Sequence, residues 1–303
     1  MKKRNFGKRI TFKDNIYAQY LLWFLIFYLL VFSPFILYGK TYLWSSDGMS
    51  QHYPSLLYTR EWVYNIVKNL FEEHVLDIPN WNIQLGFGQD VFGNAINFRL
   101  FNFLYVFFGD LPIDFYLQFR TMVSLFLCGL AFISFAKTKS SSKSAIILGT
   151  LVYLFSGFVL YFSTRHAFFL EMMFFFPLML IGVDNIFEKK KSYLFIAVVF
   201  LCGISYFYFL FMITLPAVIY SLFRYFEINK KGERSIKQFF NTVMCFFWQY
   251  ALGLLLSAFS LLPSLIKMFS SSRTGAQKGV NYLHWDLSYY LDFIKGIIDI
   301  REI

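Results

Sequence analysis

The chain has 303 residues, of which 57% are hydrophobic and 15% charged, and its mean hydropathy is +0.52. A soluble domain of this length could not bury so much apolar surface, so the composition excludes one and predicts an integral membrane protein. The net charge of +10 does not indicate a nucleic-acid partner, because Lys and Arg occur in short clusters between apolar runs. We therefore expect no nucleic acid among its partners.

Apolar runs long enough to cross a bilayer, which takes about 20 residues, recur along most of the chain. A basic segment, residues 1–20, precedes a first transmembrane helix at 21–39. Six more are expected within 115–268, which predicts an all-α polytopic membrane protein of about seven transmembrane helices. These six lie near 115–136, 145–163, 168–187, the two sides of a break at 203–206, and 243–262, where Pro263 marks the expected end.

The basic residues predict the orientation. Seventeen of the 28 Lys and Arg residues fall in the N-terminal segment and in the loops after the second, fourth and sixth helices. Loops that stay in the cytoplasm carry such an excess, so we expect a multi-pass protein of the plasma membrane with a cytoplasmic N-terminus. Residues 40–114 and 269–303 are then outer segments.

The first outer segment contains two further apolar stretches. In 54–71 the apolar residues recur at helical spacing and predict an amphipathic helix that lies flat in the headgroup layer. The run 98–108 is only about half a bilayer long, so we expect a re-entrant or interfacial piece. The three cysteines, Cys128, Cys202 and Cys245, lie in apolar runs without CxxC spacing or a nearby histidine. We interpret them as packing residues and expect no metal and no cofactor.

Candidate chemistry begins directly after the first helix. Asp47 could act as a general base toward an acceptor hydroxyl, and Gln51 or His52 could orient a phosphate or sugar. The alternative is that Asp47 and Gly48 form only a turn or a helix N-cap, which the same residue types favour.

Two residues farther along this segment are candidates for substrate binding. Arg60 lies on the polar face of the predicted helix, and Trp81 precedes the glycine-rich run 86–90. An aromatic face beside hydrogen-bonding backbone is a surface on which a sugar ring can stack. A glycine-rich loop that merely turns explains the same residues equally well.

The remaining candidate site residues are charged and lie near the predicted outer ends of later helices. Glu171 lies just inside the fourth helix, where an acid is costly unless paired and a functional role is the default hypothesis. Arg165 or His166 could be its partner or could hold a lipid phosphate, and a purely structural ion pair stays open. Arg273 is a possible anion contact or a solvated loop charge. Asp184, beside the lysines that follow the fourth helix, is interpreted as solvated.

Six short motifs together resemble the YfhO family of bacterial membrane proteins. In chain order they are SSDGMSQHYP, IPNWNIQLGFG, YLFSGF, RHAFFLEMM, FPLMLIG and YFYF. The resemblance covers the chain from about Thr41 to Arg273. Family members are usually much longer, so the resemblance implies that this chain is an N-terminal portion with a truncated outer segment at 269–303.

The resemblance also implies a fold and an activity. The family looks like a branch of the GT-C glycosyltransferases, which take a sugar from a polyprenyl-phosphate carrier and transfer it, on the outer face, to a cell-surface polymer such as lipoteichoic acid. In that class an acidic residue of the first outer loop is the catalytic base, and the matching position is Asp47. Implied partners are the lipid-linked sugar, the polymer acceptor, the bilayer and other membrane proteins of a glycosylation pathway. A flippase of a lipid-linked sugar and a non-catalytic cell-envelope scaffold remain alternatives.

Overall fold

The computed structural model describes residues 15–83, 87–91, 102–108, 111–229, 235–270 and 288. Within this part there are ten α-helices, three shorter helical turns and one two-stranded hairpin, which confirms the predicted all-α class. The chain divides into two compact units, Met1–Ser264 and Leu265–Ile303. The features below belong to the first unit unless stated.

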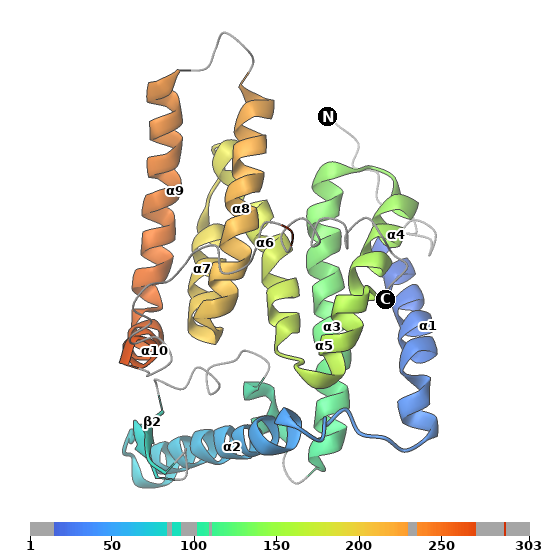
Figure 1. The fold of residues 1–303 in the computed structure, drawn as a ribbon, viewed down its shortest axis with the longest axis vertical. Coiled ribbons are helices and arrows are strands. Elements are labelled where there is room, and N and C mark those ends of the chain that lie inside the picture. Colours follow the sequence, from blue (N-terminus) through green and yellow to red (C-terminus); the bar gives the residue numbers. More distant parts are fainter. Residues whose placement is uncertain are drawn as a thin grey trace, which may run out of the picture. The chain divides into compact units, whose positions relative to one another are not determined.

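The α-helices, shown in Figure 1, are α1 (Ile16–Leu37), α2 (Tyr53–Lys68), α3 (Ile113–Lys139), α4 (Lys143–Leu154), α5 (Gly157–Arg165), α6 (Phe169–Phe187), α7 (Tyr193–Ser205), α8 (Phe207–Ile228), α9 (Ile236–Leu256) and α10 (Ala258–Ser270). The shorter elements are η2 (Gly48–His52), η3 (Asn69–Glu73), β1 (Trp81–Asn82), β2 (Gln89–Asp90) and η5 (Phe103–Phe108). The helix α10 runs across the boundary between the two units.

Local residues set both ends of α1. The Asn15 side chain accepts hydrogen bonds from the backbone N–H groups of Tyr17 and Ala18, at 3.0 and 3.4 Å, so the helix begins earlier than predicted. It ends before Gly39, whose φ of +56° suits a residue without Cβ. Between these ends, aromatic side chains four residues apart form one buried face: Tyr20, Phe24, Tyr28 and Phe32.

Five helices, α1, α3, α6, α8 and α9, are long and apolar enough to cross a membrane. The pair α4 and α5, bent by 48° at its break, would be a sixth crossing. The predicted break at 203–206 is present, because α7 ends at Ser205 and Tyr206 is extended. With 13 residues, α7 is about 20 Å long, which is shorter than the hydrocarbon core of about 30 Å. A seventh crossing by α7 alone therefore stays a prediction.

The predicted end of the last helix at Pro263 is wrong. The helix α9 ends at Leu256, and Pro263 lies inside α10. Packing is close at the break at Ser257, because a Cβ on Gly203 of α7 would come within 2.6 Å of the Ser257 Oγ. The same hydroxyl donates to the Leu254 carbonyl at 3.0 Å, which satisfies one of the last carbonyls of α9.

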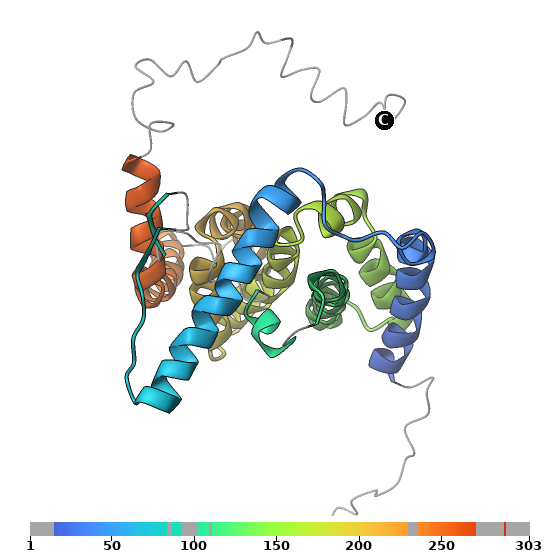
Figure 2. The same ribbon diagram turned by 90° about the horizontal axis from the view of Figure 1, so that it is seen from below.

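The helix α2 lies across the direction of the long helices, as Figures 1 and 2 show. We call this end of the unit the loop end. The opposite end, where α1 begins, carries Lys137, Lys139 and residues 189–191, and we call it the basic end. Of the predicted piece 98–108, the described part is 102–108, most of which is η5, and η5 packs between α2 and α3 through Leu56, Tyr105 and Tyr116. It does not cross the unit.

The apolar face predicted for α2 is divided along its length. Trp62 is buried, and Val63 and Ile66 pack beside it. Farther along, Val67, Leu70 and Phe71 are exposed. An exposed apolar end on a helix that lies across the bundle suits contact with a membrane surface, as the sequence predicts.

Candidate functional site

The segment after α1 folds so that Asp47 is held from one side. The turn η2 starts directly after Asp47, whose side chain makes no capping hydrogen bond. Instead, Gln51 Nε2 donates to Asp47 Oδ1 at 3.0 Å. Gly48 is buried, and a Cβ there would lie 3.3 Å from both Leu43 and Trp44, so a small residue lets the turn pack closely. Asp47 therefore occupies the N-cap position of η2 without a capping hydrogen bond from its side chain, and the turn alternative stays open.

Two distant segments meet at this turn. His52 Nε2 lies 3.0 Å from His166 Nδ1, although the two residues are 114 positions apart. The other nitrogen of His166 lies 4.0 Å from Asp47 Oδ2. That distance exceeds a direct hydrogen bond, and the Asp47 side chain is 40% exposed. The arrangement is a row of carboxylate, imidazole and imidazole in which the carboxylate can still accept a proton from outside.

Arg165 supplies a positive charge beside this row. Its guanidinium lies over the rings of Tyr161 and Trp44, at 4.1 and 5.6 Å from the ring centroids. Such stacking uses the face of the guanidinium and leaves its N–H groups available to an anion. Trp44 also meets His166 edge to face, with centroids 5.3 Å apart. The aromatic ring of Trp44 thus links the cation to the histidine.

A small cavity of about 10 Å³ lies behind the row. This is room for about one water molecule and far less than a sugar needs, so a sugar would have to bind on the exposed side of Asp47 and Arg165. Burial raises the pKa of the Tyr42 phenol, which lines the cavity. Tyr42 therefore stays neutral and shares a hydrogen bond of 3.2 Å with the Tyr28 hydroxyl.

A second charged group lies deeper at the loop end. Glu171, in the first turn of α6, is only 1% exposed and interacts electrostatically with Arg120 of α3. The Arg120 Nη1 donates to Asn102 Oδ1 at 3.1 Å. Of the partners predicted for Glu171, Arg165 packs on aromatic rings instead. Arg120 and Asn102 were not among the predicted site residues, although a cation inside an apolar span is the signal that identifies Arg120.

Two predicted residues make their contacts away from the row, and a third cannot be placed. Arg60 lies over the Tyr105 ring, 5.3 Å from its centroid. Trp81 is in the hairpin of β1 and β2, which is anchored on the second half of α2 by a hydrogen bond from Trp62 Nε1 to the Pro79 carbonyl. From Tyr53, where α2 begins after η2, to this anchor at Trp62 is nine residues, or about 14 Å of helix. Arg273 lies outside the described residues.

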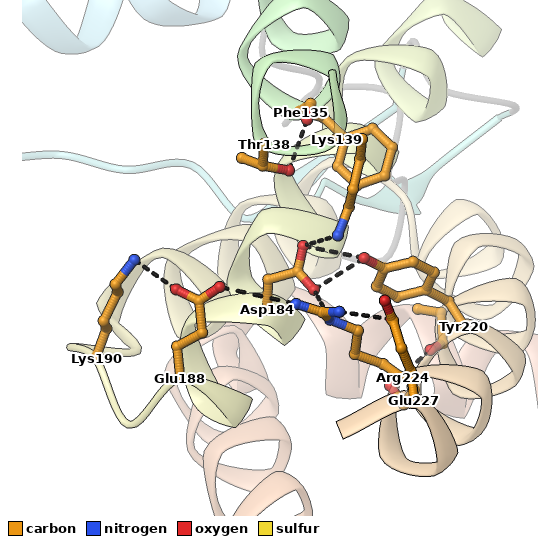
Figure 3. A network of polar contacts seen from close by, with 11 residues as sticks. Phe135, Thr138, Lys139, Asp184, Glu188, Lys190, Tyr220, Arg224 and Glu227 are labelled. Carbon is orange, nitrogen blue, oxygen red and sulfur yellow. Dashed lines mark hydrogen bonds and ion pairs between the residues drawn. The ribbon is translucent and has the colours of Figure 1, made fainter. Parts of the chain in front are cut away.

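Asp184 at the basic end corrects an expectation. It is 4% exposed rather than solvated. Its carboxylate accepts hydrogen bonds from Lys139 Nζ at 2.7 Å, from the Tyr220 hydroxyl at 2.8 and 3.0 Å, and from Arg224 Nε at 2.9 Å (Figure 3). These donors come from α3 and α8, so one carboxylate on α6 joins three helices. Sequence position beside lysines could not reveal that tertiary contacts enclose it.

The profile of the family described as bacterial membrane protein YfhO matches residues 19–300. No curated protein and no solved structure matches the chain.

Proposed function

The chain belongs to the YfhO family of bacterial membrane proteins, and from that premise we propose that it is a membrane glycosyltransferase. It moves a sugar from a polyprenyl-phosphate carrier to a cell-surface glycopolymer of the teichoic-acid type. The proposal takes the loop end as the outer side, as the distribution of Lys and Arg predicts.

One observation carries the proposal. Asp47 and His166, singled out separately in the sequence, come within 4.0 Å of each other, and His52 lies 3.0 Å from the same histidine. A half-exposed carboxylate, two imidazoles and a cation are thereby gathered at one surface. These are the groups that a reaction with a hydroxyl acceptor and a phosphate leaving group requires.

The reaction uses these groups as follows. The Asp47 carboxylate takes the proton of the acceptor hydroxyl as that oxygen attacks the anomeric carbon of the sugar. The bond from the anomeric carbon to the carrier's phosphate oxygen breaks, and the phosphate leaves with the electron pair. The Arg165 guanidinium offsets the charge that develops on the phosphate. Gln51, which donates to the carboxylate, holds it in position.

The packing of α6 weighs against the flippase alternative. A lipid-linked sugar that crosses the membrane needs a polar path from one end of the bundle to the other. Polar groups lie at both ends of α6, at Glu171 and Asp184, but the buried residues described between them are apolar, glycine or proline. They include Phe175 and Met179, which belong to a continuous apolar core.

The test is complementation of a strain that lacks the gene. We expect the unaltered gene to restore the sugar of the surface polymer and Asp47→Asn to lower its transfer rate by about 100-fold or more, the effect of losing a general base. Asp77→Asn is the matched control, because Asp77 is an exposed carboxylate of the same outer segment. It should behave as the unaltered gene.

Membrane levels of all three forms are measured alongside. If Asp47→Asn restores the sugar as fully as Asp77→Asn does, Asp47 is not the base and the transferase proposal fails. A scaffold would give that result, because its function depends on its folded surface and not on one carboxylate.

A further inference from the structure

An apolar groove lies between α8 and α9, in the half of these helices nearer the basic end. Its volume is about 310 Å³, within the range of sites that hold small molecules. Val218 and Leu222 of α8 and Val243 and Phe247 of α9 line it, with residues of α6 and α7 such as Phe195. It lies far along the chain from Asp47 and shares no residue with the site described above.

Two polar residues of the groove's lining join its two walls. The Thr214 Oγ1 and the Tyr250 hydroxyl lie 2.9 Å apart and join α8 to α9. From Thr214 to Leu222 is eight residues, about 12 Å of helix, and half of the hydrocarbon core is about 15 Å. The groove thus has the length of one leaflet, and it ends near the middle of α8.

The rims of the groove are exposed apolar side chains, Val218, Leu222, Val243 and Phe247. Both rim helices are long and apolar enough to cross a membrane, so the opening faces hydrocarbon. An empty apolar space would lose dispersion contacts along its whole wall. A flexible hydrocarbon chain restores those contacts.

We propose that the groove binds one acyl chain of an anionic phospholipid in the leaflet at the basic end. The headgroup of such a lipid lies at the level of exposed lysines, including Lys237 in the first turn of α9 and Lys191 after α6, whereas Lys190 is paired with Glu188. Lysines at a membrane surface favour anionic headgroups. The hydroxyl bridge of Thr214 and Tyr250 also disfavours an occupant that spans the full bilayer, such as another helix.

The test compares two adjacent residues of α8. Val218 and Ile219 are 50% and 47% exposed, but only Val218 lines the groove. The purified chain is equilibrated with equal amounts of phosphatidylglycerol and phosphatidylcholine of the same chains, and retained lipid is measured by native mass spectrometry. We expect one retained phosphatidylglycerol for the unaltered chain and for Ile219→Trp. Val218→Trp should retain about tenfold less, since each displaced methylene weakens binding several-fold.

A second pair of variants distinguishes the loss of lipid binding from misfolding. Leu222→Trp also fills the groove, whereas the exposed neighbour Phe223→Trp does not. Equal retention by the filled and control variants of both pairs would overturn the proposal. Equal retention of the two lipids would overturn its anionic part, and cross-links between two copies through the groove would assign it to a dimer instead. None of these measurements records sugar transfer, so the outcome for lipid binding is independent of the proposed activity.

Discussion

Two aspartates at opposite ends of the bundle show how differently one side chain can be used. Asp184 at the basic end is buried and accepts hydrogen bonds from three side chains on two neighbouring helices. Asp47 at the loop end is 40% exposed, with one hydrogen bond from Gln51 and a histidine 4.0 Å away. Both carboxylates have nitrogen-bearing side chains as neighbours, yet their surroundings differ.

Because of this difference, Asp184 is suited to stabilising the fold and Asp47 to taking part in a reaction. A carboxylate whose oxygens are already satisfied by two cations and a phenol has little capacity left for a substrate, and removing it leaves two partly buried cations without that carboxylate. A carboxylate with an open oxygen can take a proton or bind a donor. We therefore expect changes at Asp184 to act on folding and changes at Asp47 to act on turnover.

The largest effect on stability is expected from Asp184→Ala. It leaves Lys139 and Arg224 without their shared carboxylate, and breaking such a buried pair costs about 3 kcal/mol. Thermal unfolding of the detergent-solubilised chain measures it. Glu227→Gln is the control, because this exposed partner of Arg224 should contribute at most about 0.5 kcal/mol. Equal melting temperatures for both variants would show that the buried cluster does not hold the three helices together.

A smaller effect is expected from Gly182→Ala, two residues before Asp184. A Cβ there would lie 2.8 Å from the Cβ and 2.9 Å from the Cα of Phe195, so α6 and α7 would have to separate. Overpacking of this kind costs about 2 kcal/mol. Gly149→Ala is the matched control, because its Cβ would be 3.6 Å from the nearest atom, on Phe132. Helix propensity should make that change neutral or stabilising. A loss of the same size in both variants would argue against close packing at the basic end.

The smallest effect concerns the histidine pair at the loop end. His52→Phe, His166→Phe and the double variant form a cycle whose coupling free energy should be about 1 kcal/mol, the net value of one hydrogen bond. Thermal unfolding again supplies the measurement. The control cycle pairs His52→Phe with His74→Asn, since His74 is exposed after η3. Coupling as weak as in the control would mean that the two segments meet without depending on each other.

Sequence reasoning predicted the helices better than it predicted their ends. Long apolar runs located α1, α3, α6 and α8, because the hydrocarbon sets a minimum length that composition records directly. Pro263 misled, since it lies inside α10 while α9 already ends at Leu256. Asp184 misled because the lysines nearest to it in sequence are residues 189–191, whereas its partners come from other helices.

The candidate site likewise has a part that the sequence predicted and a part that it did not. Asp47, His52, Arg165 and His166 could each be singled out from the sequence, because they put a carboxylate, imidazoles and a cation beside apolar runs, at the expected membrane surface. Their meeting could not be predicted, nor that Trp81 would lie in a hairpin anchored on α2. The sequence by itself determined that this chain is a multi-pass membrane protein and which side chains could do chemistry. Only the tertiary structure decided which of them share one surface, since contacts between residues 114 positions apart depend on how helices pack and not on local pattern.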